Sequence, residues 1–424
     1  MKGRVWYETL GCKANQYDTE KLRALLEGLG WVAVSDPGEA DLLLVNTCAV
    51  TSVAEKKSRQ ALSRARKLAP RAKVVALGCW ATRLQNQGRP FPGTCDFALG
   101  EGAREEGFRR LLQKLGEEDP GSFPVLENYR RRHRAFLKVQ DGCDFHCTYC
   151  VIPSLRGPSR SRPLREVLAE AASLVRAGTR EIVLTGVCLG DWKEKGEGLE
   201  RLVTGLLELE GPFRLRLSSL EPEKVTPSLL EILAGAGRGR VCPHLHLPLQ
   251  SGSDRVLKRM GRRYRAGDFR SILEAARRVF GPAFSFTTDV IAGFPGEREE
   301  DFQATLDLLE DLEPTRVHAF PYSPREGTPA TRFPDPLHRE VVKERTSRLL
   351  DRARRWAEKA ARKRLGTRQE ILLEKPGEGV SAGYQRVILE EPAGNPGDLV
   401  PVVITGLKGE SLLAQTLEGK VLSG

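Results

Sequence analysis

Between residues 135 and 335 the chain repeats a strand signal followed by a helix signal, and this repeat restricts the possible folds more than any other feature. We expect strands near residues 136 to 140, 181 to 186, 213 to 219, 244 to 250, 284 to 292 and 316 to 321. Long helical patterns, such as Leu164 to Ala177 and Glu299 to Leu312, separate most of them. Six such units rather than eight predict an α/β fold, an open and partial (β/α)6 barrel of the triosephosphate-isomerase type. Any active site should lie at the carboxyl ends of its strands.

A cysteine-rich loop follows the first of these strands. The run Cys-Asp-Phe-His-Cys-Thr-Tyr-Cys separates Cys143, Cys147 and Cys150 by three and then two residues. Three thiolates on one loop can hold three irons of a 4Fe-4S cluster and leave the fourth iron for another ligand. Such a ligand could be the amino and carboxylate groups of a methionine-derived cofactor, an arrangement suited to delivering one electron to a sulfonium. The spacing alone also allows a zinc site or structural thiols.

The first 118 residues contain a second set of cysteines. Alternating strand and helix patterns there predict a parallel sheet, with strands at residues 5–10, 42–45 and 73–77 and helices at about 16–29 and 53–68. Each strand is followed within a few residues by a cysteine: Cys12, Cys48 and Cys79. Parallel strands end at one edge of a sheet, so these three thiols can meet there. A single free cysteine is more often a small core residue, but the threefold recurrence favours a second cluster with its own open iron.

The remaining cysteines, Cys95, Cys188 and Cys242, lack this context, and we interpret them as structural or incidental. Nine cysteines, an odd number, argue against a disulfide framework and indicate a reducing compartment. The sequence has neither an apolar run of 18 or more residues nor a signal-peptide pattern. We therefore expect a cytoplasmic protein without a membrane partner.

The charge distribution points to a polyanionic partner. The net charge is +11, which favours nucleic acid. Residues 338 to 364 contain eleven Lys or Arg against four Asp or Glu, and a linker at residues 119 to 134 ends in the basic run Arg130 to Arg134. Either segment could bind RNA phosphates, but a solvated linker explains each about equally well.

The last segment, residues 366 to 424, has short β runs broken by glycine turns, which is typical of a small five-stranded barrel of the oligonucleotide-binding kind. It contains five Lys or Arg and eight Asp or Glu, which is unusual for an RNA-binding module. RNA would then meet a local patch with Arg386 and Lys408, or bind mainly to the basic helix and linker.

The cysteine loop, with the aromatic Tyr149 before its last cysteine, resembles the signature of the radical S-adenosylmethionine (SAM) superfamily. The whole chain is similar to the methylthiotransferases of that superfamily. The resemblance implies an auxiliary-cluster α/β domain at residues 1–118, a radical SAM barrel at 135–335, a basic connecting helix at 336–365 and a TRAM-like β-barrel at 366–424. Residues 9–20 and 241–252 are most similar to the branch that acts on N6-threonylcarbamoyladenosine beside the tRNA anticodon. Branches acting on isopentenyladenosine in tRNA, or on an aspartate of a ribosomal protein, rank behind it.

The resemblance also implies site residues. Cys143, Cys147 and Cys150 would hold the SAM-cleaving 4Fe-4S cluster, and Cys12, Cys48 and Cys79 the auxiliary 4Fe-4S cluster. The candidates for lining the SAM pocket are Tyr149, Thr185, Gly186, Ser218, Gln250 and Gly293. A 5′-deoxyadenosyl radical would take hydrogen from C2 of the adenine, after which the auxiliary cluster supplies sulfur and a second SAM the methyl group. The electron donor and any catalytic side chain cannot be identified from the sequence.

Two other functions fit parts of the sequence. Both cysteine triplets could bind zinc in a non-enzymatic RNA-binding scaffold, in which case metal content would be near two zinc ions rather than near eight irons per chain. Alternatively, a radical enzyme could modify a protein, with the basic surface docking on a ribosome. Activity on isolated tRNA would distinguish that case.

Overall fold

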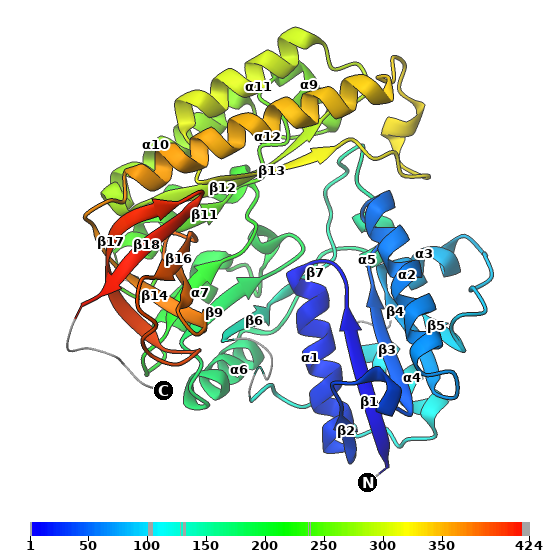
Figure 1. The fold of residues 1–424 in the computed structure, drawn as a ribbon. Helices are drawn as coiled ribbons and strands as arrows, with labels where there is room; N and C mark the ends of the chain where they lie inside the picture. Colours follow the sequence, from blue (N-terminus) through cyan, green and yellow to red (C-terminus); the bar gives the residue numbers. More distant parts are fainter. Residues whose placement is uncertain are drawn as a thin grey trace. The chain divides into compact units, whose positions relative to one another are not determined.

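The structure is a computed structural model that describes residues 2–100, 105–127, 129, 133–235, 237 and 239–417. The chain divides into two compact units (Figure 1). The first comprises Met1–Leu126, Asp141–Arg160 and Ser323–Thr328, and the second Glu127–Gln140, Ser161–Tyr322 and Pro329–Gly424. Part of the predicted basic linker, residues 130–132, lies outside the described residues.

The first unit is built on a parallel sheet with strand order β2-β1-β3-β4-β5, which confirms the predicted architecture. Its strands are β1 (Gly3–Thr9), β2 (Trp31–Ala33), β3 (Leu42–Thr47), β4 (Lys73–Gly78) and β5 (Phe97–Leu99). Its helices are α1 (Lys13–Gly28), α2 (Ser52–Leu68), α3 (Cys79–Asn86), α4 (Glu105–Leu115) and α5 (Ile152–Arg156). The short edge strands β2 and β5 were not predicted from the sequence.

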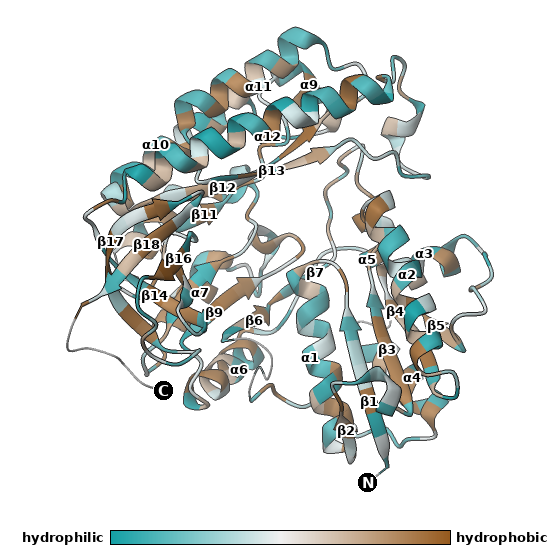
Figure 2. Cartoon of the chain, in the orientation of Figure 1, coloured by the Kyte–Doolittle hydropathy of each residue, from teal (hydrophilic) through white to brown (hydrophobic). Residues whose placement is uncertain are grey.

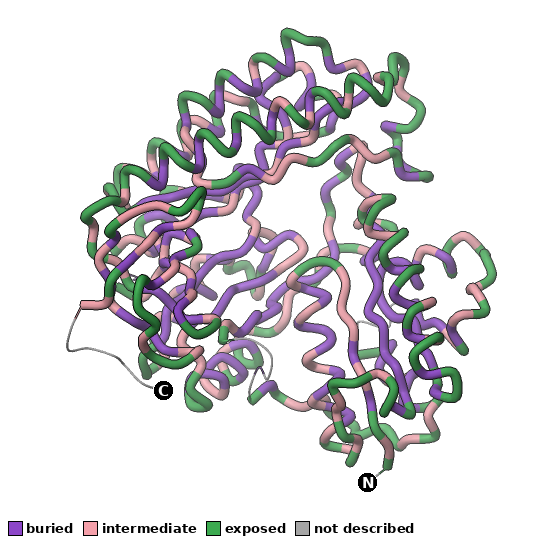
Figure 3. The backbone as a smooth tube through the Cα atoms, viewed as in Figure 1, coloured by how far each residue is buried: buried purple, intermediate pink, exposed green. Residues whose placement is uncertain are grey.

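The central strand β3 contributes to a hydrophobic core on each face of this sheet. Every residue of β3 is buried, and the strand is strongly hydrophobic (Figures 2 and 3). Leu43 and Val45 belong to one hydrophobic core, while Leu42 and Leu44 belong to another. Because successive strand residues point to opposite faces, the two cores lie on opposite faces of the sheet.

The second unit contains the six parallel strands predicted for the barrel. They are β6 (Arg134–Lys138), β9 (Glu181–Thr185), β10 (Arg214–Leu217), β11 (His244–His246), β12 (Ser285–Ala292) and β13 (Arg316–Pro321). They form the sheets β10-β9-β6 and β11-β12-β13, which the parallel bridges Leu215↔Val241 and Ser219↔His246 join. Spatial order therefore follows chain order, as in an open (β/α)6 barrel.

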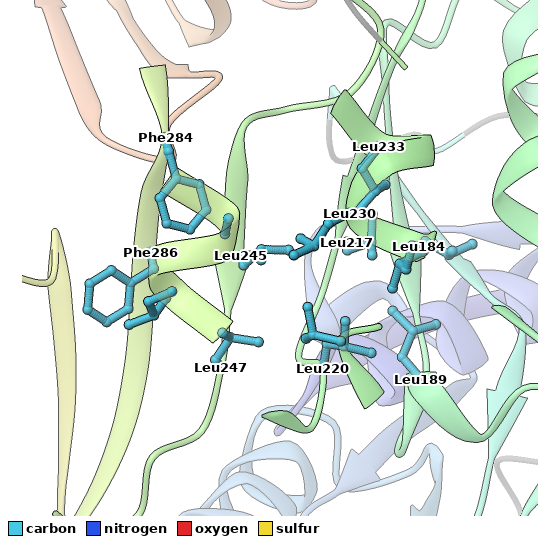
Figure 4. Close-up of a cluster of buried hydrophobic side chains, with 14 of the residues drawn as sticks. Leu184, Leu189, Leu217, Leu220, Leu230, Leu233, Leu245, Leu247, Phe284 and Phe286 are labelled. Atoms are coloured by element: carbon cyan, nitrogen blue, oxygen red, sulfur yellow. The ribbon is translucent and has the colours of Figure 1, made fainter. Parts of the chain in front are cut away.

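Helices cover one face of this barrel and build its core. They are α6 (Leu164–Arg176), α7 (Leu199–Leu207), α8 (Pro227–Ala234), α9 (Asp254–Met260), α10 (Ala266–Phe280) and α11 (Glu299–Leu312). One hydrophobic cluster joins the inner faces of α6, α7, α8, α10 and α11 to alternate strand residues, among them Leu184, Leu217 and Leu245 (Figure 4). The short strands β7 (Gln140–Asp141) and β8 (Arg160–Ser161) pair beside the barrel.

The end of the chain forms a long helix and a small barrel. Helix α12 (Arg339–Arg362) lies over β13 and α11 (Figure 1). The five strands β14 (Arg368–Lys375), β15 (Glu378–Ser381), β16 (Arg386–Leu389), β17 (Leu399–Lys408) and β18 (Ser411–Thr416) then close in the order β14-β15-β16-β18-β17, which confirms the predicted five-stranded barrel. In the part of the chain that the structure describes, we find no helix with the length and apolar character needed to cross a membrane.

Candidate metal centres and cofactor pocket

The three cysteines of the first unit follow neighbouring strands. Strand β3 lies between β1 and β4, and its register pairs Thr9 with Asn46 and Thr47 with Gly78. The three strand ends are therefore level. Cys12 is the N-cap of α1, Cys48 follows β3, and Cys79 is the first residue of α3.

Two glycines allow the cysteine-bearing turns to approach one another. Gly11 has φ +100°, and a Cβ added there would lie 3.1 Å from Cys48 Sγ. Gly78 has φ +84°, and a Cβ there would lie 2.3 Å from Asn46 Oδ1. A side chain at either position would be strained in conformation and crowded in space. The repeated Leu-Gly-Cys sequence is thus a consequence of close packing at this sheet edge.

The three thiols influence one another electrostatically. The pKa of Cys48 is raised to about 11, mainly by burial and to a smaller extent by the neighbouring Cys79 and Cys12, while a backbone hydrogen bond at Val50 and Arg156 oppose the rise. Burial also raises the pKa of Cys79, again with Arg156 opposing it and Cys12 adding to it. Protein groups alone therefore disfavour the thiolate forms of Cys48 and Cys79. A bound metal centre would supply the missing positive charge, and thiolates are its natural ligands, so the donor set fits an iron–sulfur cluster.

Arg156 connects the cysteine loop to these thiols. The residue is only 4% exposed, and its guanidinium donates to Asp141 Oδ1 at 2.8 Å and to the side-chain oxygen of Asn15. Asn15 in turn donates to the backbone oxygens of Leu10 and Thr47, at 2.8 and 3.1 Å. Burial opposes ionisation of Arg156, but Asp141 and then Cys79 raise its pKa well above the ordinary value. A fixed positive charge thus stands beside the thiol site.

The loop with Cys143, Cys147 and Cys150 groups with the first unit, although we expected it to belong with the barrel. Gly142, with φ +76°, begins the loop, and a Cβ there would lie 2.0 Å from Pro158 O. The Cys143 backbone N–H donates to Gly157 O at 3.1 Å, and the Phe145 N–H donates to Cys143 Sγ at 3.4 Å. These two bonds fix the backbone at the start of the loop.

Five of the six candidate SAM-pocket residues lie in the second unit, and Tyr149 lies in the first. Thr185 is buried at the end of β9 and donates its hydroxyl to Val183 O at 3.0 Å. Gly186 follows it, and a Cβ there would lie 3.0 Å from Gln140 Oε1. Ser218 is buried, and its hydroxyl has no hydrogen-bond partner among the described residues. Its hydroxyl is thus available to a ligand.

The other two candidates have unusual backbones. Gln250 has φ +64°, which is rare for a residue other than glycine, and its N–H and C=O bond to Asp289 O and the Ile291 N–H. Gly293 has φ +79°, and a Cβ there would lie 2.5 Å from Val342 of α12. The positive φ of Gln250 turns the chain after β11. The missing side chain of Gly293 allows Val342 of α12 to pack closely against it.

Sequence reasoning missed a buried carboxyl group near the end of β10. Burial raises the pKa of Glu221 to about 7, although a hydrogen bond from Cys188 lowers it. Its second oxygen has no partner among the residues that the structure describes. The only sign of this carboxyl group in the sequence is the segment Ser-Ser-Leu-Glu-Pro after the strand. Its residues are common in turns, so the segment did not stand out as part of a site.

Comparison with known proteins agrees with this geometry. Residues 137–309 match the radical SAM superfamily, and residues 4–100 match an uncharacterized protein family, UPF0004. A radical SAM methyltransferase from Kitasatospora setae, TsrM, has a similar structure, with a TM-score of 0.54, 16% identity and coverage of 75% of this chain and 72% of that one. At this identity the likeness concerns the fold alone.

Relatives of higher identity extend over most of the chain. The threonylcarbamoyladenosine tRNA methylthiotransferase MtaB of Thermotoga maritima is 38% identical over 98% of both chains. Its namesake in Chlamydia pneumoniae is 38% identical over 91% of this chain and 90% of that protein. The protein of the same name in Bacillus subtilis is 37% identical over 82% of this chain and 79% of that protein.

The fold and the cysteine loop define a radical SAM enzyme. Within that class, the chain belongs to the methylthiotransferase family, whose members transfer sulfur. The predicted cofactors, SAM and 4Fe-4S clusters, are confirmed by this membership. A non-enzymatic zinc scaffold is not supported.

Proposed function

We propose that this protein adds a methylthio group to C2 of N6-threonylcarbamoyladenosine at position 37 of tRNA, and that it works in the cytoplasm, where tRNA is found. The names of its three relatives support this substrate. One observation about the chain itself carries the proposal: three cysteines meet at one sheet edge beside the buried Arg156. A radical SAM enzyme that transfers sulfur needs such a second thiolate site.

In this proposal residues 1–118 and 135–335 hold separate cofactors. Cys143, Cys147 and Cys150 bind the SAM-cleaving cluster, and Cys12, Cys48 and Cys79 bind the auxiliary one. Tyr149 and the five candidates at the strand ends bind SAM, with the unpartnered Ser218 hydroxyl as a hydrogen-bonding group. When bound, SAM and the two clusters supply the radical, sulfur and methyl chemistry that protein side chains lack. Asn15, which accepts from Arg156, bonds to the turns that carry Cys12 and Cys48.

The basic residues of helix α12 fall into two groups, those that form ion pairs within the protein and those available to RNA. Arg345 forms an ion pair with Glu297 at 2.8 Å, and Lys359 forms one with Glu313 at 2.5 Å. Arg348, Arg352 and Lys363 likewise pair with acidic residues in or next to α11. Four exposed cations have no ion-pair or hydrogen-bond partner among the described residues: Arg339, Lys343, Arg355 and Arg362. We propose that these four contact the phosphates around the tRNA anticodon loop.

Mass spectrometry of tRNA nucleosides tests the proposal. Cells lacking this gene should lose 2-methylthio-N6-threonylcarbamoyladenosine and keep the unmodified nucleoside, and the wild-type gene should restore it. Rescue with Cys48→Ala should fail. Cys95→Ala is the matched control, because Cys95 is also a buried thiol of the first unit but donates only to Pro92 O. Loss of methylthiolated isopentenyladenosine instead would identify the sister substrate, and unchanged tRNA would contradict both.

A further inference from the structure

A polar cluster lies on the barrel face opposite the helices. Along β11 and β12, Leu245, Phe286 and Val290 belong to the hydrophobic core against the helices. Side chains alternate along a strand, so His246 and Asp289 point to the other face. Strand β13 adds His318, which the register pairs with Asp289. Two imidazoles and one carboxylate from three adjacent strands thus share one face.

The three side chains converge. Each offers one ligand atom, and these atoms all lie within 4.8 Å of one another. His246 Nε2 is 3.4 Å from Asp289 Oδ2, and the rings of His246 and His318 are 5.8 Å apart between centroids. All three residues are only partly buried, so an ion could reach them.

The separation between His246 and Asp289 suits a shared ion better than a direct hydrogen bond. An N–H···O bond usually spans about 2.7–3.2 Å. Two ligands at about 2.1 Å from a tetrahedral Zn²⁺ are about 3.4 Å apart, which follows from the geometry of the tetrahedron. The observed 3.4 Å equals that edge. His318 would complete a set of two histidines and one carboxylate, and the fourth position would stay open to an oxygen ligand.

A neighbouring hydroxyl orients the first histidine. Thr287 Oγ1 lies 2.8 Å from His246 Nδ1 and 3.1 Å from His244 Nε2. A hydrogen bond at Nδ1 fixes the ring and turns Nε2 toward Asp289. Metal-binding histidines are commonly held by a partner on the second ring nitrogen in this way.

We propose that His246, Asp289 and His318 bind one divalent first-row transition ion, and Zn²⁺ is the ion we use to test the site. The site uses nitrogen and oxygen donors and is separate from both cysteine sets. It does not depend on the tRNA substrate proposed above.

Zinc binding to the cluster-loaded enzyme tests the proposal. The protein is dialysed anaerobically against buffered Zn²⁺, and zinc and iron per chain are measured by mass spectrometry. Wild type should bind one zinc without losing iron. His318→Gln and Asp289→Asn should each weaken binding by more than about 100-fold, because removing a ligand costs more than removing a residue that only orients a ligand. Thr287→Val should weaken it by about 10–100-fold.

Matched controls separate this site from other histidines and from folding defects. His338→Gln should bind zinc as wild type does, because His338 is exposed at the N-cap of α12. X-ray absorption on the zinc-loaded wild type needs no variant and should show nitrogen and oxygen neighbours at about 2.0–2.2 Å. A sulfur shell near 2.3 Å, absence of zinc uptake, or equal zinc binding by His318→Gln would each overturn the assignment.

Discussion

Glu181→Gln should destabilise the second unit more than any surface substitution, because Glu181 neutralises a buried group of arginines. Its side chain is fully buried. Arg214 Nε donates to Oε2 at 2.6 Å, and Arg216 Nε donates to Oε1 at 2.8 Å. Although burial opposes its ionisation, Arg216 and Arg214 hold the pKa of Glu181 far below its ordinary value. The carboxylate therefore contributes its full stability above pH 4.5, and the contribution fades only as the pH falls toward the lowered value.

The same arginines also donate hydrogen bonds to backbone oxygens of the carboxy-terminal barrel. Arg214 donates to Glu370 O and Val380 O at 3.1 and 2.9 Å, and Arg216 donates to Ala382 O at 2.9 Å. The ring of Tyr384 lies 4.9 Å from the Arg216 guanidinium carbon. Removing the charge of Glu181 leaves the buried Arg216 without its anion and leaves Arg214 only the more distant Glu370, at 3.9 Å, which costs about 3–5 kcal/mol. That is a large part of the ordinary 5–15 kcal/mol stability of a domain.

Urea unfolding of the second unit, followed by hydrogen exchange of its strands, measures the effect. Arg270→Gln is the control, because Arg270 pairs with Asp311 at 2.9 Å on the surface and should cost only about 0–1 kcal/mol. The double variant Glu181→Gln/Arg216→Met should cost less than the sum of its single changes, since one unpaired cation is also removed. A Glu181→Gln variant within 1 kcal/mol of wild type, or strict additivity in the double variant, would refute this reasoning.

Three further predictions concern acidity, RNA and the auxiliary site. Raising the pH from 4.5 to about 7 should lower the stability of the second unit by about 3 kcal/mol, because Glu221 is protonated when folded and loses its proton more easily when unfolded. Equilibrium unfolding should show this slope in wild type and not in Glu221→Gln. Neutralising the four exposed cations of α12 should reduce the salt slope of tRNA binding by about 0.7–0.9 per lost phosphate contact, whereas changing the paired Arg352 and Lys359 should leave it unchanged. The triple substitution of Cys12, Cys48 and Cys79 by Ala should leave SAM cleavage intact but abolish transfer of the methylthio group. Chromatography of 5′-deoxyadenosine measures the first activity, and mass spectrometry of tRNA nucleosides measures the second.

Strand positions were predictable from hydrophobic patterns, but some of their limits were not. Strand β11 was expected over residues 244 to 250 and covers only His244–His246. Pro248 has no N–H to donate, and the positive φ of Gln250 takes the chain out of the strand conformation. Strands this short still place their side chains alternately. The pattern His-Leu-His, taken at a period of two, therefore indicates the polar barrel face.

Long-range packing was the part that local patterns could not predict. The cysteine loop follows a barrel strand in sequence, yet Val151 and Leu155, just after it, are buried in the core of the first unit with Trp80. Such a contact depends on two surfaces that meet only in the folded chain. The three cysteine turns, in contrast, were predictable because parallel topology brings consecutive strand ends to one edge.

The acidic composition of the carboxy-terminal barrel has a structural explanation that sequence alone did not suggest. Glu374 pairs with Arg134 at 2.6 Å, and Glu370 Oε1 lies 3.9 Å from Arg214. Backbone oxygens of the small barrel also accept from Arg214 and Arg216. Negative charge on this module therefore complements cations of the radical SAM barrel. Acidic residues that contact arginines in this way give the module little basic surface. The four exposed cations of α12, which have no partner among the described residues, are therefore the stronger candidates for binding tRNA.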